Sequence, residues 1–103
     1  MTARRYSGDV RRVMVLAVAC VLINERRATF ESLTRAELAD ASGISGPAIE
    51  HHFGDMISVR RALVQHAVEH NEARVLLQAL AAGVVDPMVL SVRVRREIKR
   101  LIV

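Results

Sequence analysis

The stretch that decides the fold is residues 34–53, which read TRAELADASGISGPAIEHHF. Thr34 followed three positions later by Glu37 fits a capping box, in which the threonine side chain accepts from a helical N–H and the glutamate reaches back. Gly43 can adopt the left-handed backbone that ends a helix, and Ser45 is a typical cap for the next helix. The stretch therefore predicts a helix, a tight glycine turn and a short second helix.

Small and apolar residues recur in this stretch where the two helices have to meet. Ala39 is small enough to let the helices approach closely, and Ile44 and Ile49 fill the angle between them. This arrangement directs the N-terminal end of the second helix, predicted over residues 46–52, outward. A helix end presented in that way can enter the major groove of DNA.

Three further helices are predicted outside this stretch, over about residues 9–27, over 56–82, and from Asp86-Pro87 toward the C-terminus. The first is apolar on nearly all sides across its middle, so we expect other helices to wrap it. The helix over 56–82 carries two apolar stripes, and we expect one to cover the core and the other to contact a partner subunit.

The fold class that follows is all-α, with about five helices. We expect a three-helix helix-turn-helix head at residues 1–55, with a basic N-terminal arm. A tail at residues 56–103 would consist of the long helix and a C-terminal amphipathic helix. We expect this tail to join two copies of the chain into a homodimer.

Length and composition are those of one small globular domain. The chain has 103 residues, of which 51% are hydrophobic and 25% charged, with a net charge of +4. Its single cysteine, Cys20, cannot form an intramolecular disulfide, so a cytoplasmic location is expected. The apolar run at residues 13–23 follows two arginines and imitates a signal peptide, but it is too short to span a bilayer. We expect a buried helix there, and no membrane partner.

The motif resembles the DNA-binding segment of the bacterial TetR family. That pattern runs roughly Thr-x-x-Glu-Ile/Leu-Ala-x-x-Ala/Ser-Gly-Val/Ile-Ser-x-Gly/Pro-x-Leu/Ile-Tyr-x-His-Phe. The matching positions are Thr34, Glu37, Leu38, Ala39, Ser42, Gly43, Ile44, Ser45, Pro47, Ile49, His52 and Phe53. The resemblance covers about residues 10–68. It implies a transcriptional regulator that binds double-stranded DNA sequence-specifically as a homodimer, and we expect it to repress by occupying an operator.

The resemblance also implies which positions contact DNA. They lie at the start of the first motif helix and on the exposed face of the second: Arg35, Ala36, Ser45, Gly46, Pro47, Ala48, His51 and His52. Two positions depart from the family, because its usual tyrosine is Glu50 here and its usual lysine is Met56. Glu50 can instead accept from a cytosine amino group. We expect Arg4 and Arg5 in the arm to reach a neighbouring groove or phosphate.

An alternative function follows from the charge of the motif region. Residues 31–58 hold one arginine against five carboxylates, a formal net charge of −4. Negative charge opposes binding to phosphates, which supply much of the affinity for DNA. The chain can therefore also be interpreted as a helix-turn-helix protein-interaction module that binds another regulator or a polymerase. Arg60 and Arg61, early in the helix over 56–82, are candidates for the missing positive charge.

No catalytic constellation, phosphate loop or metal-ligand cluster is evident, so we expect neither an enzyme nor a cofactor. Full-length TetR members carry a much larger ligand-binding part, and residues 56–103 are too few to enclose a comparable pocket. His66 and His70 lie one helical turn apart, and a packed pair is favoured over a metal site. The basic residues between 91 and 103 have three interpretations: a solvated face, a surface for DNA or another acidic partner, and a membrane-adsorbed face.

Overall fold

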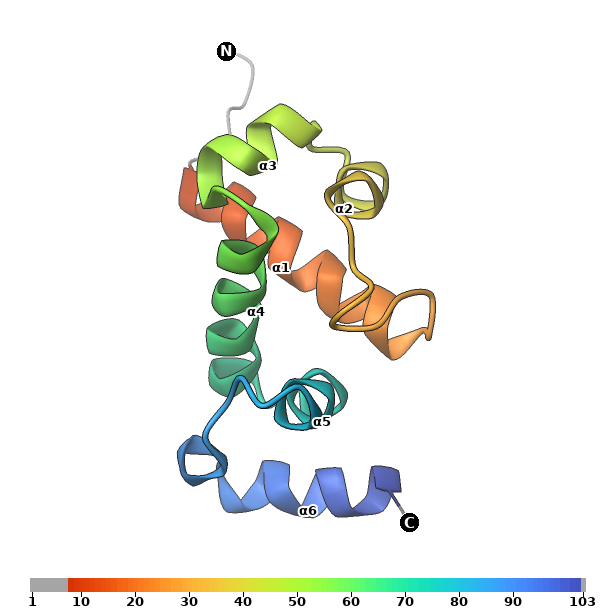
Figure 1. The fold of residues 1–103 in the computed structure, drawn as a ribbon, viewed down its shortest axis with the longest axis vertical. Coiled ribbons are helices and arrows are strands. Elements are labelled where there is room, and N and C mark those ends of the chain that lie inside the picture. The colour runs from red at the N-terminus through yellow and green to blue at the C-terminus, as the bar shows by residue number, and fades with distance from the viewer. Residues whose placement is uncertain (1–7, 103) are drawn as a thin grey trace, which may run out of the picture.

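The computed structural model describes residues 8–102 and is built of helices (Figure 1). No strand occurs among these residues, so the predicted all-α fold class is confirmed. The elements are α1 (Gly8–Asn24), α2 (Arg35–Ser42), α3 (Gly46–Phe53), α4 (Met56–His70), α5 (Ala73–Ala81), the 3-10 turn η1 (Pro87–Val89) and α6 (Val92–Ile102).

The molecule is elongated, with extents of 49 × 27 × 22 Å. Figure 1 shows α2 and α3 at one end of the long axis and α6 at the other, with α1 and α4 crossing between them. Helix α1 contacts each of α2, α3, α4 and α5. The buried side chains form one continuous cluster that extends from α1 to α6. The two ends of the molecule are therefore held apart by a packed middle.

Helix α1 is the centre of the core, but it is buried on one side only. Val15, Ala19 and Ile23 are fully buried, whereas Val13 and Val21 are about half exposed, at 53% and 50%. The expectation that other helices wrap α1 on nearly all sides is wrong, because α2 to α5 all pack on the same side of it. The helix also ends at Asn24, three residues earlier than predicted.

Cys20 belongs to the buried side of α1. Burial raises the pKa of its thiol to about 12, and the negative charge of Glu72 adds to the rise. The thiolate is the reactive form of cysteine, so this environment favours an inert thiol that serves as a small core residue.

The predicted helix over 56–82 is two helices, which corrects the sequence-based expectation. Asn71 ends α4 in the left-handed conformation, with φ 55° and ψ 44°, and its N–H donates to the Ala67 carbonyl. Asparagine adopts this conformation more readily than most residues. The chain then turns, and α5 packs against α1 and α6. The structure therefore has six α-helices among residues 8–102, where about five were expected.

The C-terminal region also differs from the prediction. The Asp86 side chain accepts from the Met88 N–H at 2.9 Å, so it caps a turn as expected, but that turn is the short η1. Helix α6 begins only at Val92. Its apolar residues Val94 and Ile98 are buried against α5 of the same chain, and this part of the tail is therefore not free for a partner subunit.

None of the helices in the described part of the chain has the length and apolarity needed to cross a bilayer.

Candidate nucleic-acid interface

The first helix of the motif begins as its sequence predicts. Thr34 Oγ1 accepts from the Glu37 N–H at 3.1 Å, and Glu37 Oε1 accepts from the Thr34 N–H at 3.0 Å. This reciprocal capping box satisfies two backbone donors that would otherwise have no partner. It fixes where α2 begins, and so fixes the position of Arg35 in its first turn.

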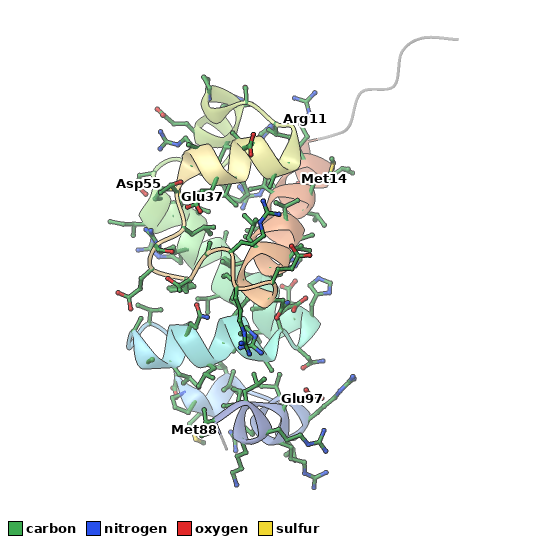
Figure 2. The ribbon with its side chains drawn as sticks, turned by 90° about the vertical axis from the view of Figure 1, so that its right-hand side faces the viewer. Arg11, Met14, Glu37, Asp55, Met88 and Glu97 are labelled. Atoms are coloured by element: carbon green, nitrogen blue, oxygen red, sulfur yellow. The ribbon has the colours of Figure 1, made fainter. Side chains whose placement is uncertain are left out.

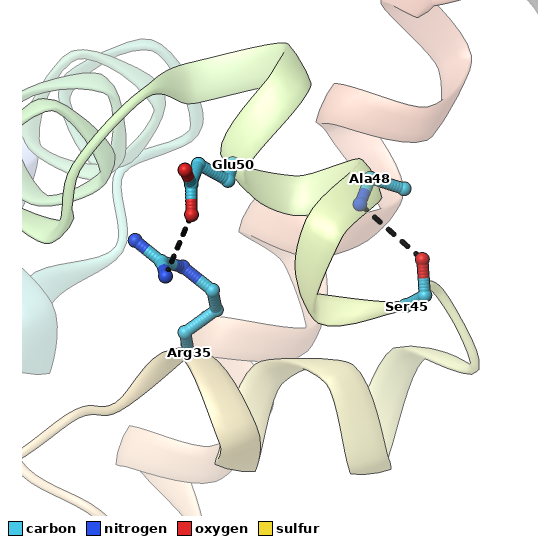
Figure 3. Close-up of polar contacts among 4 residues, drawn as sticks. All are labelled: Arg35, Ser45, Ala48 and Glu50. Atoms are coloured by element: carbon cyan, nitrogen blue, oxygen red, sulfur yellow. Dashed lines mark hydrogen bonds and ion pairs between the residues drawn. The ribbon is translucent and has the colours of Figure 1, made fainter.

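The turn between α2 and α3 also forms as predicted. Gly43 has φ 74° and ψ 7°, and its N–H donates to the Ala39 carbonyl at 3.0 Å. Ser45 Oγ then accepts from the Ala48 N–H at 3.2 Å and caps α3 (Figure 3). Figure 1 shows α2 end-on and α3 across the view, so the two helices run in clearly different directions.

Helix α3 is anchored on one side and open on the other. Ile49 is fully buried, whereas Pro47, Glu50 and His51 are exposed. An open cleft of about 840 Å³ lies between the N-terminal ends of α2 and α3. Six of the predicted contact residues line this cleft: Arg35, Ala36, Gly46, Pro47, Glu50 and His51.

Within this cleft, Arg35 is paired with Glu50. Arg35 Nη1 lies 3.0 Å from Glu50 Oε2, joining the first turn of α2 to the exposed face of α3 (Figure 3). The Arg35 stem lies along Gly46, where an added Cβ would be 3.7 Å from Arg35 Cδ. Arg35 Nε is buried and has no hydrogen-bond acceptor within residues 8–102. Glu50 therefore pairs with the guanidinium through Nη1, whereas the Nε–H of the same group has no acceptor among these residues.

The predicted residues Ser45 and Ala48 lie in a second hollow, apart from the main cleft. This hollow measures about 380 Å³ and is also lined by Arg11 and Met14 of α1. Figure 2 shows Arg11 at the same end of the molecule as Glu37 and Asp55, far from Glu97 of α6. The sequence did not predict that α1 lies next to the start of α3, because this proximity depends on how α1 packs against the other helices.

His52 is placed by packing against α1. The Arg12 guanidinium donates to the His52 carbonyl and lies 4.4 Å from the centroid of the Phe53 ring. An added Cβ on Gly8 would lie 3.6 Å from His52 Cε1, so the imidazole is next to the first residue of α1. His52, which the family resemblance places among the DNA contacts, is thus packed against α1 in this structure.

Among the other predicted sources of positive charge, Arg60 is one whose contacts the structure describes. Arg60 donates to the carbonyls of Phe30, Glu31 and Leu33 at 2.9–3.0 Å, so it holds the loop between α1 and α2. These acceptors use Nε and Nη2 and give Arg60 a structural role, and its contact with a phosphate stays a prediction. Arg4 and Arg5 lie outside the described residues.

Two of the five acidic residues around the motif, Glu37 and Asp55, serve as helix caps. Asp55 Oδ1 accepts from the Ser58 N–H at 2.9 Å at the start of α4. Its hydrogen bonds to Ser58 hold the pKa of this exposed carboxyl below its usual value, with a smaller effect from Arg61. Glu37 closes the capping box of α2. The capping roles of Asp55 and Glu37 therefore account for part of the negative charge of residues 31–58.

His66 and His70 of α4 form a packed pair, with ring centroids 4.3 Å apart. His66 is buried, and burial, followed by the positive charge of His70, lowers its pKa. Among residues 8–102, no group of three or more His, Cys, Asp or Glu side chains is arranged to hold a metal ion.

Comparison with known proteins adds no relative. No family model, no curated protein and no solved structure matches this chain significantly, and the resemblance to the TetR family rests on its helix-turn-helix residues alone.

Proposed function

We propose that this protein is a TetR-like transcriptional regulator that binds specific duplex DNA as a homodimer and represses by occupying its site. The observation that carries the proposal is the open cleft between the starts of α2 and α3. It gathers Arg35, Gly46, Pro47 and His51 around a helix whose start is fixed by Ser45. Residues at the start of a recognition helix are those that reach base edges and phosphates.

Arg35 is the residue that we assign to a phosphate. Its side chain is 34% exposed and lines the cleft, so a phosphate oxygen could reach its Nη groups in place of the Glu50 carboxylate. Binding would exchange the Glu50 carboxylate for a phosphate, so the guanidinium would remain paired throughout. An exposed ion pair contributes about 0–1 kcal/mol, so the exchange costs little. Glu50, once released, can accept from a cytosine amino group in the major groove.

The homodimer would form through residues 56–103, where apolar side chains remain exposed. Ile57 is 64% exposed and Val84 56% exposed, and both line a groove of about 400 Å³ together with Phe30 and Val64. A two-fold dimer through this surface would place two copies of α3 on half-sites about one or more DNA turns apart.

Binding to random-sequence duplex at about 50 and 200 mM salt tests the proposal, because affinity carried by phosphate contacts falls steeply with salt. Selection from a random library would then identify the preferred site. Failure to bind any duplex at the lower salt concentration would refute this function.

The Arg35–Glu50 pair also favours a second candidate function, a protein-interaction module. The pair neutralises the only arginine among residues 31–58 and leaves a negatively charged surface. Such a surface suits a basic site on another regulator or on a polymerase. This candidate predicts that a pull-down retains one defined protein after nuclease treatment, and recovery of nucleic acid alone would contradict it.

A further inference from the structure

Helix α6 presents an unusually dense positive face. Its five basic residues are all exposed: Arg93, Arg95, Arg96, Lys99 and Arg100. At 100° per residue they cover the side of the helix opposite to Val94 and Ile98, which are buried. Figure 2 shows nitrogen-tipped side chains that project from α6 away from the rest of the molecule.

This face is held in place by the fold. Val94, Ile98 and the preceding Leu90 anchor α6 in the common core. Ser91 Oγ accepts from the Val94 N–H at 3.1 Å and donates to Asn71 Oδ1 at 3.1 Å, which ties the start of α6 to the turn between α4 and α5. The positive face is therefore a fixed surface on a folded element.

The positive charge of α6 is also largely uncompensated. Glu97 is the only acidic residue of the helix, and no ion pair involves an α6 side chain within the part of the chain that the structure describes. Arg93, Arg96 and Arg100 form a row about 10.5 Å long, from a rise of 1.5 Å per residue. One DNA strand presents about three phosphates over that length.

We propose that the basic face of α6 binds the phosphate backbone of duplex DNA, at the end of the molecule opposite to α3. A membrane surface is a poorer partner, because an interfacial helix inserts a continuous apolar face into lipid. In α6 the central apolar residues Val94 and Ile98 are packed on α5, and the exposed ones lie only at its two ends: Val92, Leu101 and Ile102. Residues 84–102 also lack aromatic side chains that could serve as interfacial anchors.

The position of α6 gives this phosphate binding a consequence. Helices α3 and α6 lie at opposite ends of a molecule 49 Å long (Figure 1). If α3 binds one duplex, α6 faces away from it and is free to bind a second segment. The protein would then bridge two DNA segments. Bridging rests on the proposed function of α3, whereas phosphate binding by α6 does not.

The test uses the variant Arg93→Gln/Arg96→Gln/Arg100→Gln in the full chain. Glutamine keeps the helix propensity of arginine but removes the charge. The matched control, Arg26→Gln/Arg27→Gln/Arg74→Gln, removes the same net charge from positions outside α6. Circular dichroism and sedimentation verify that both variants keep the fold and oligomeric state of the wild type. The probes are random-sequence duplex, a labelled duplex captured on beads that carry a second duplex, and phosphatidylcholine–phosphatidylserine vesicles.

The proposal predicts that the α6 variant loses bead capture and that the salt slope of its duplex binding falls by about 2.7, which is about 0.9 for each of the three phosphates that the arginines would bind. The control should match the wild type. An unchanged salt slope in the α6 variant would overturn the proposal, as would binding of the wild type to vesicles but not to duplex. Capture that persists in the variant would overturn bridging through α6. If Arg35→Ala leaves duplex binding unchanged while the α6 variant abolishes it, phosphate binding by α6 stands and the proposed function of α3 fails.

Discussion

Arg35 and Glu50 form an ion pair of 3.0 Å that connects the start of α2 to the exposed face of α3. Both residues line the same cleft, and both belong to the set that the sequence assigned to DNA contact. In the absence of DNA, each of these two charged side chains is paired with the other. If Arg35 binds a phosphate as we propose, the strength of this ion pair sets how easily it can do so.

Glu50→Gln should strengthen binding to random-sequence duplex by up to about fivefold, because it removes an ion pair worth about 0–1 kcal/mol that competes with phosphate. Arg35→Ala should weaken binding and lower the salt slope by about 0.9, the value for one phosphate contact. Fluorescence anisotropy over a salt series measures both effects. Glu31→Gln, which makes the same charge change outside the cleft, is the control, and an equal gain from both glutamines would show that the pairing with Arg35 is irrelevant.

Arg60→Ala should destabilise the fold by about 2–3 kcal/mol, because three carbonyl oxygens of the loop between α1 and α2 lose a charged donor. Arg60→Lys should destabilise the fold less than Arg60→Ala, because lysine keeps the positive charge. It should still destabilise the fold, because lysine lacks the planar set of donors that arginine has. The free energy of unfolding in urea measures these losses. Arg61 is exposed and adjacent, so Arg61→Ala serves as the control. Equal stabilities for the two alanine variants would refute the structural role of Arg60.

The pH dependence of stability should contain a contribution from His66. Its pKa is lowered in the folded state by burial and by His70, so the folded protein binds this proton less readily than the unfolded chain does. Stability from this group is fully present above the unfolded pKa of about 6.5 and is lost as the pH falls below that value. The free energy of unfolding in urea, measured at pH 7.5 and at pH 5.5, gives this loss of stability. Each pH is about one unit from the unfolded pKa of about 6.5.

His66→Gln should reduce the loss of stability between those two pH values, since glutamine does not titrate. Gln65→Ala changes the exposed neighbour and should leave the pH dependence as it is in the wild type. The assignment to His66 would be wrong if the glutamine variant lost as much stability on acidification as the wild type.

Local features of the fold were predictable from the sequence because short-range contacts determine them. The capping box of Thr34 and Glu37, the left-handed Gly43 and the cap at Ser45 each depend on residues within a few positions of one another. The same rules placed Arg35 and Pro47 at the starts of their helices. The sequence could thus predict the helix-turn-helix and the set of residues around its cleft.

Features that depend on tertiary packing were not predictable in this way. The break at Asn71 interrupts an apolar pattern that continues on both sides, and it forms where α5 turns to pack against α1 and α6. The carbonyls that accept from Arg60 lie about 30 positions earlier in the chain. The pairing of Arg35 with Glu50 likewise depends on how α2 and α3 are placed, which spacing in the sequence does not specify.

The turn between α2 and α3 can be tested by comparing two glycines of the same motif. Gly43 has φ 74°, a conformation that costs other residues about 1–2 kcal/mol. An added Cβ there meets no atom within 4 Å, so any destabilisation of Gly43→Ala comes from the backbone and not from a clash. We expect a loss of about 1–2 kcal/mol in the free energy of unfolding, and a smaller loss for Gly43→Asn, since asparagine tolerates this conformation better.

Gly46→Ala is the matched control, because Gly46 lies inside α3 with an ordinary φ and an added Cβ would make only normal contact with Arg35 Cδ at 3.7 Å. This substitution should stabilise the protein by about 0.4–1 kcal/mol by reducing the freedom of the unfolded chain. Urea unfolding of both variants gives the comparison. If Gly43→Ala proved as stable as Gly46→Ala, the left-handed turn that sets α3 against α2 would not be the structure of this motif in solution.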